Sequence, residues 1–81
     1  MSALTKRSFS LAGHRTSVAL EVEFWDVLGG IARSRGVLLG QLVAAVDAAR
    51  DGAAPLASEL RLLALKEALA KGSAVSLVTQ R

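Results

Sequence analysis

The sequence predicts a mainly α-helical protein with a short β-ribbon, in the order strand, helix, helix and a third helix. Two observations carry this prediction. Residues 15–20 alternate in polarity, as a strand does, and three later stretches repeat their apolar residues at helical spacing. A chain of 81 residues has room for one domain, so residues 1–81 are expected to fold as a single unit.

The expected strand has one face suited to burial and one face suited to contact with a partner. The face suited to burial comprises Thr16, Val18 and Leu20. The other face comprises Arg15, Ser17 and Ala19. A single strand must pair with another strand to be stable in water. Later in the chain, the one candidate partner strand is the weak segment 74–79. Antiparallel pairing with the same strand of a second copy about a two-fold axis is therefore favoured.

The segment before this strand is basic. Residues 1–5 have no pattern and are expected to form a disordered arm, and residues 6–11 alternate weakly, as a short strand or an ordered arm. The first twenty residues contain Lys6, Arg7 and Arg15 and no acid. This distribution favours an anionic partner at one end of the protein. The alternative is that these cations only keep a tail soluble.

Three helices are expected after the strand. The first begins near Val22 and ends at Gly36, a good C-terminal stop, and the second runs from Gly40 to about Arg50. The strand and these two helices thus occupy 14–50. A clear loop signal ends at Pro55, and an extra helix is expected over 55–71. Residues 72–81 are expected to be a tail, with an alternative of a short extended piece at 75–78.

Composition restricts the function. Hydrophobic residues make up 52% of the chain and there is no cysteine, which favours a subunit interface that completes a small core. His14 is the only histidine, so no metal site is expected. The sequence contains no cofactor motif and no acid–base pair, so it does not predict an enzyme. The absence of a long apolar run argues against a membrane span and a secretory signal, and the cytoplasm is the expected location.

Several of these residues together resemble the ribbon-helix-helix family of the Arc/MetJ type, small bacterial and phage DNA-binding transcription factors. The residues are Thr16-Ser17-Val18-Ala19-Leu20-Glu21, then Phe24-Trp25, Leu28, Ile31-Ala32 and Arg35-Gly36, then Leu42-Val43 and Val46. The run Ala12-Gly13-His14-Arg15-Thr16-Ser17 ahead of Glu23-Phe24-Trp25 is similar to a short bacterial subgroup that has an extra C-terminal helix. The resemblance covers about residues 7–70.

This resemblance implies an intertwined homodimer, in which one strand from each chain forms an antiparallel ribbon that enters the major groove of double-stranded DNA. Its outward side chains, Arg15, Ser17 and Ala19, would read base edges, and Arg15 suits guanine. The start of the second helix, Leu39 and Gly40, would bind a phosphate through backbone N–H groups. The implied dimer interface comprises Thr16, Val18, Leu20, Phe24, Trp25, Leu28, Leu42, Val43 and Val46.

Other roles follow for the remaining candidates. Lys6 and Arg7 suit phosphate contacts, and His14 is a turn residue or a further phosphate contact. Arg15 would otherwise be an exposed strand arginine, and Trp25 is core or interface rather than a stacking platform. The sequence departs from the family pattern at Ala19, where a long polar side chain is common, and at Leu38-Leu39-Gly40, which lacks a Ser or Thr cap.

The function predicted first is that of a homodimeric transcriptional regulator, a repressor. The alternative is an antitoxin or adaptor in which the wide apolar third helix, Leu56–Lys71, binds a partner protein.

Overall fold

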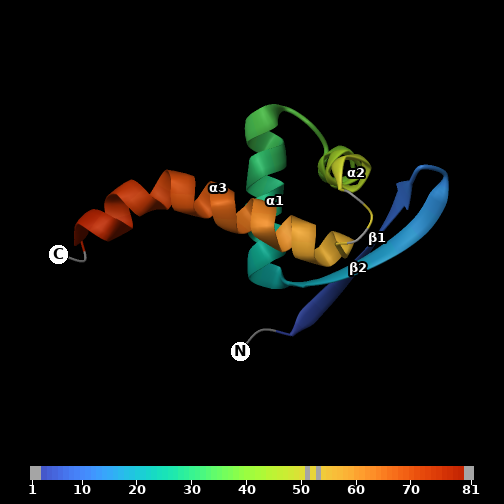
Figure 1. Cartoon of the computed structure of the whole chain (residues 1–81), viewed down its shortest axis with the longest axis horizontal. Helices are drawn as coiled ribbons and strands as arrows, with labels where there is room; N and C mark the ends of the chain where they lie inside the picture. The colour runs from blue at the N-terminus through green and yellow to red at the C-terminus, as the bar shows by residue number, and fades with distance from the viewer. Residues whose placement is uncertain (1–2, 51, 53, 80–81) are drawn as a thin grey trace.

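The computed structural model describes residues 3–50, 52 and 54–79. It contains two strands followed by three helices (Figure 1). In chain order they are β1 (Leu4–Leu11), β2 (His14–Glu21), α1 (Val22–Arg35), α2 (Leu39–Ala49) and α3 (Leu56–Thr79). The predicted mainly α-helical fold with a β-ribbon is confirmed.

The two strands form one antiparallel hairpin within the chain. Their register runs from the pair Leu11 and His14 beside the turn to the pair Leu4 and Glu21 at the base. The turn residues Ala12 and Gly13 have φ angles of 52° and 82°. Positive φ at both positions is the geometry of a type I′ turn, whose twist matches that of the strands it joins.

This hairpin differs from the sequence prediction in two respects. β2 has a partner strand in its own chain, whereas the sequence favoured pairing with a second copy. Residues 4 and 5 belong to β1 and not to a disordered arm. Both differences have one cause, because Ala12 takes a left-handed conformation that alanine rarely adopts. With Ala12 in that conformation, a two-residue turn can join the weak pattern of residues 6–11 to β2.

Helix α1 follows β2 without a loop. Its N-cap is Glu21, and its C-cap is Gly36, whose φ of 71° is left-handed. The Gly36 N–H donates to the carbonyl oxygen of Arg33 at 3.1 Å, and Arg33 and Arg35 lie in the last turn, where cations suit the helix dipole. The sequence placed both ends of this helix correctly.

Helix α3 is longer than the sequence predicted. It continues through Gly72 to Thr79, so the expected tail from residue 72, including the possible extended piece at 75–78, is helical as far as the described residues extend. A glycine inside a helix costs about 1 kcal/mol relative to alanine, which does not by itself end the helix. The preceding loop also matches the prediction in position, since α3 begins directly after Pro55.

The hydrophobic core lies between one face of the hairpin and the three helices. Its buried members are Leu11, Val18, Leu20, Trp25, Leu28, Ile31, Ala32, Leu42, Val43, Leu56, Leu60 and Ala64. Every element contributes at least one of them. The hairpin turn and the C-terminal half of α3 lie at opposite ends of the molecule (Figure 1), which is 48 Å long.

Two ion pairs attach α3 to the rest of the fold. Arg61 Nε donates to Glu21 Oε1 at 3.1 Å, at the junction of β2 and α1, and the Arg61 guanidinium lies 5.8 Å from the centre of the Phe24 ring. Arg35, at the end of α1, lies 3.4 Å from a carboxylate oxygen of Glu67. The two contacts hold α3 across α1 at both ends of that helix.

Candidate nucleic-acid interface

The hairpin has two faces of opposite chemistry. The inner face packs on the helices and comprises Thr5, Arg7, Phe9, Leu11, Thr16, Val18 and Leu20. The outer face points away from them, and between the turn and the base of the hairpin it comprises Lys6, Ser8, Ser10, Arg15, Ser17 and Ala19. The base pair of the hairpin, Leu4 and Glu21, lies on the same face. Side chains alternate along each strand and cross-strand pairs share a face, so the register gives these assignments, and it places the exposed His14, opposite Leu11, on the inner side of the tip. None of the six outer-face residues between the turn and the base is acidic, and the one acid of this face, Glu21 at its base, is paired with Arg61.

The three predicted base-reading residues lie together on the outer face. Arg15, Ser17 and Ala19 follow one another along β2, and Arg15 and Ser17 are exposed while Ala19 is half-buried. The Ser17 hydroxyl lies 3.0 Å from the hydroxyl of Ser8 on β1. Either hydroxyl can still donate to or accept from a base or a phosphate.

Sequence reasoning did not select Ser8 and Ser10 as site residues. Both lie on the outer face, opposite Ser17 and Arg15. The available signal was the alternation of residues 6–11 combined with a two-residue gap before β2. Recognising that gap as a turn places these two serines beside the predicted readers.

Lys6 and Arg7 are separated by the strand geometry. Lys6 lies on the outer face opposite Ala19. Arg7 lies on the inner face, where its guanidinium lies 5.4 Å from the centre of the Trp25 ring. A cation over an indole ring is a stabilising arrangement, so Arg7 has a structural role that the sequence did not predict. Its predicted phosphate contact stays a prediction.

His14 lies next to the hairpin turn and is exposed. Together with the neighbouring Arg15, it places an imidazole ring and a guanidinium group near the hairpin tip. The tip projects from the body of the molecule (Figure 1), so both side chains can reach a large partner without rearrangement of the core. His14 is the first residue of β2, directly after the turn residues Ala12 and Gly13, so it is a strand residue and not the turn residue that the sequence predicted; a phosphate contact stays a prediction.

The start of α2 lies beside the hairpin. A Cβ added to Gly40 would lie 3.7 Å from the Phe9 ring of β1. The N-cap is Leu38, whose side chain has no oxygen to cap the helix, and its own N–H donates to Gln41 Oε1 at 2.8 Å. The next backbone N–H groups, those of Leu39 and Gly40, belong to the first turn, where a helix offers donors without an intrahelical acceptor.

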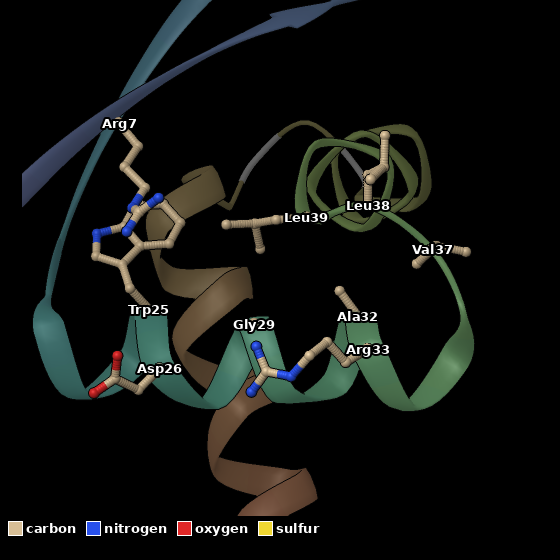
Figure 2. A pocket seen from close by; sticks show the side chains of 9 residues that line it. All are labelled: Arg7, Trp25, Asp26, Gly29, Ala32, Arg33, Val37, Leu38 and Leu39. Atoms are coloured by element: carbon tan, nitrogen blue, oxygen red, sulfur yellow. The ribbon is translucent and has the colours of Figure 1, made fainter.

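A cleft of about 490 Å³ lies between the hairpin, α1 and the start of α2 (Figure 2). Its lining residues are Arg7, Trp25, Asp26, Gly29, Ala32, Arg33, Val37, Leu38 and Leu39. In Figure 2 the Arg7 side chain descends from β1 onto Trp25, whereas the Arg33 side chain lies along α1 beside Gly29. Leu38 and Val37 at the rim are exposed apolar residues.

Most of the predicted interface residues are core residues of one chain. Those buried are Val18, Leu20, Trp25, Leu28, Leu42 and Val43, and those half-buried are Thr16, Phe24 and Val46. Trp25 is 3% exposed, and its indole N–H donates to the Thr5 carbonyl oxygen at 2.8 Å, so it is a core residue and not a stacking platform. Contact of this set with a second chain stays a prediction.

Helix α3 presents a buried face and an exposed one. Leu56, Leu60 and Ala64 are buried in the core. A stripe on the other side, Leu62, Leu65 and Leu69, is 46%, 49% and 54% exposed. This stripe, here called the leucine stripe, has the spacing of one helix face.

Glu21 lies on the same face of β2 as Arg15, Ser17 and Ala19, at the base of the hairpin. Its pKa is lowered, first by a hydrogen bond from its own backbone N–H and then by the hydrogen bond and charge of Arg61. The carboxylate therefore stays ionised, and Arg61 offsets its charge. The acid at the base of the outer face is thus paired with a cation.

Within the described part of the chain, no group of three or more metal-binding side chains comes together, and no helix has the length and hydropathy to cross a bilayer.

A family model described as a ribbon-helix-helix domain matches residues 4–68. Searches of curated proteins and of solved structures found no match. The matched region contains the hairpin, α1, α2 and the first half of α3. The chain belongs to the ribbon-helix-helix domain family, a DNA-binding fold.

Proposed function

We propose that this protein is a homodimeric transcriptional regulator, a repressor, that inserts an antiparallel β-ribbon into the major groove of DNA. One observation carries the proposal: the outer face of the hairpin is polar and basic, includes Arg15, and has its one acid, Glu21, at the base in an ion pair with Arg61. Such a face suits the negative phosphates and the acceptor-rich base edges of the groove. A regulator of this kind acts in the bacterial cytoplasm, where the chromosome lies.

A homodimer is supported by an unpaired strand edge. β1 covers one edge of β2, and no strand in the described part of the chain covers the other. An open edge of a strand is a template for a second chain. The exposed Val37 and Leu38 beside the cleft supply apolar surface that a second copy can bury.

Each outward side chain has a distinct part in the reading. The Arg15 guanidinium donates to guanine O6 and N7 in a bidentate contact, and the Ser17 hydroxyl bonds several bases with little discrimination. The Ala19 methyl packs on a thymine methyl. The backbone N–H groups of Leu39 and Gly40 bind a phosphate, which fixes the ribbon in the groove without reading sequence.

The proposal is tested by measuring the affinity of the purified protein for genomic fragments at two salt concentrations. The control is a protein of similar size and net charge without the hairpin. Tighter binding than the control to some fragments, and weaker binding at higher salt, is expected. Equal binding by the two proteins at low salt would exclude a DNA-binding regulator.

A second candidate function is that of an antitoxin or adaptor that binds a partner protein. The specific observation in its favour is the leucine stripe of α3, which is apolar and about half exposed. Removal of the whole of α3 would also remove Leu56, Leu60 and Ala64 from the core, so truncation is a poor test. The triple variant Leu62→Ser/Leu65→Ser/Leu69→Ser is better, because it should lose a co-purifying partner and keep DNA binding. Loss of both activities would show that they are not separate.

A further inference from the structure

We infer that β1 stays paired with β2 when the protein is on DNA, so that the dimer presents a four-stranded sheet, β1-β2-β2-β1. In this arrangement the two β2 strands occupy the groove, and the β1 strands lie over the phosphates at its two sides, with Lys6 as the contact. The inference rests on the proposed function and differs from the two-stranded ribbon that the family resemblance implies.

β1 is firmly attached to the body of the protein. The Trp25 indole N–H donates to the Thr5 carbonyl oxygen at 2.8 Å. The Arg7 guanidinium covers the Trp25 ring, and the Phe9 ring lies 5.9 Å from it, centre to centre. Leu11, at the end of the strand, is 4% exposed. Displacement of β1 would break each of these contacts and expose Trp25, so β1 is part of the fold and not a removable arm.

The strand pairing leaves β2 ready for a second copy. In a hairpin with a two-residue turn, the pair that closes the turn, Leu11 and His14, exchanges hydrogen bonds, and bonded and non-bonded pairs then alternate. The backbone N–H and C=O groups of Arg15, Ser17 and Ala19 therefore point to the uncovered edge. A second β2 strand can bind there while β1 keeps its place on the opposite edge.

The dimensions assign β1 to the sides of the groove. Neighbouring strands lie about 4.8 Å apart, so the outer strands of a four-stranded sheet are separated by about 14 Å. The major groove is about 12 Å wide and admits a two-stranded ribbon. The two β2 strands fit, and the β1 strands come to lie above the phosphates.

Lys6 is the cation that reaches a phosphate from this position. It lies on the outer face of β1 opposite Ala19, and Ser8 and Ser10 follow it with hydroxyl donors. The short Ala19 side chain leaves the long Lys6 side chain unobstructed. By contrast, Arg7 points to the opposite side of the strand and stays on Trp25.

The first test locks β1 to β2 without altering the six outer-face residues between the turn and the base. Leu4 and Glu21 form the cross-strand pair at the base of the hairpin. Because hydrogen-bonded and non-bonded pairs alternate from the turn onward, this pair is a non-bonded one. Such a pair has a Cα separation of about 4.5 Å, which a disulfide can span. The chain has no cysteine, so a Leu4→Cys/Glu21→Cys variant contains one possible disulfide. Oxidation then closes β1 at both ends, and the strand can no longer leave.

The oxidised and reduced forms of this variant are compared on the same DNA. The inference predicts equal affinity within about twofold, because the lock removes a motion that binding does not require. Binding by the reduced form together with a loss of about tenfold or more in the oxidised form would overturn it and support the two-stranded ribbon. If the protein with its native sequence also binds no fragment better than the control protein, the proposed function itself fails.

The second measurement does not depend on the disulfide. Lys6→Gln should lower the salt dependence of binding by about two ions for a dimer, because each subunit then has one cation fewer on a phosphate. Lys66→Gln, an exposed lysine on α3, is the matched control and should leave the slope unchanged. An unchanged slope for Lys6→Gln would show that β1 does not reach the phosphates.

Discussion

The outer face of the hairpin and the leucine stripe of α3 are two exposed surfaces of contrasting chemistry. The first is polar and basic, and between the turn and the base its side chains are short except for Lys6 and Arg15. The second is apolar and about half exposed. They lie on elements at opposite ends of the chain, and the hairpin tip and the C-terminal half of α3 point in opposite directions (Figure 1).

Both surfaces arise in the same physical way. In each element, one face is fixed in the core by burial, and the other face is left for a partner. In the hairpin the two faces alternate residue by residue, and in α3 they alternate with the helical period. What differs is the chemistry of the exposed face, and this difference decides the class of partner. Hydrogen-bond donors and cations suit DNA, whereas leucines suit a protein surface.

The largest effect is expected from variants that compare how much the two faces of α3 contribute to the free energy of unfolding. Leu60 is 0% exposed and Leu65 is 49% exposed. Leu60→Ala should lower the free energy of unfolding by about 2–5 kcal/mol, because it leaves a cavity in the core. Leu65→Ala should change it by about 0.5 kcal/mol or less. Urea denaturation of both variants measures the difference, and similar losses would mean that the leucine stripe is covered in solution.

The next effect tests the outer face of the hairpin. Arg15→Ala should remove about 1–3 kcal/mol of discrimination between DNA sequences, or about 5- to 150-fold in affinity for the specific site. The melting temperature should stay the same, since Arg15 is exposed. Lys66→Ala is the control for removal of a cation elsewhere. If Arg15→Ala lowers the stability and leaves the DNA affinity unchanged, the residue has a structural role.

The sequence was a good guide to the elements that obey a simple period. The alternation of Val18 and Leu20 with Arg15 and Ser17 predicted which face of β2 is buried, and Gly36 predicted the end of α1. In both cases the local signal and the tertiary structure agree, because the same residues that favour the local conformation also face the core.

The sequence was a poor guide where a residue takes a conformation against its preference or where a partner strand decides the outcome. Ala12 gives no sign of a left-handed turn, so the pairing of β1 with β2 was not predicted. As a result, Ser8 and Ser10 were missed and Lys6 and Arg7 were grouped together. The strand geometry separates them, because adjacent residues of a strand point to opposite faces.

The hairpin turn offers a smaller effect that sharpens the comparison. Ala12 has a φ of 52°, which is unfavourable for alanine, and it precedes Gly13. Ala12→Asn creates the Asn-Gly pair preferred in type I′ turns and should stabilise the protein by about 0.5–1 kcal/mol. Ala12→Val, with a β-branched side chain at positive φ, should destabilise it. Thermal unfolding of the two variants checks the opposite signs, and the same sign for both would argue against this turn.

The smallest expected effect on stability concerns the ion pair that joins the two regions. It connects Glu21 at the base of the hairpin with Arg61 on α3. Because the pKa of Glu21 is lowered in the folded state, the ionised carboxylate stabilises the fold above its ordinary pKa of about 4.5. This stabilisation disappears as the pH falls through the lower folded-state value. Both side chains of the pair are partly exposed, so solvent screening keeps this stabilisation small.

Two variants separate the causes of this pH dependence. Glu21→Gln should remove it entirely, whereas Arg61→Gln should remove only a part, because the backbone hydrogen bond of Glu21 remains. The difference in unfolding free energy between each variant and the unchanged protein, measured from pH 7 to pH 3, should therefore shrink as the pH falls. A difference that is constant with pH would mean that Arg61 holds α3 on the hairpin through its packing on Phe24 and not through its charge.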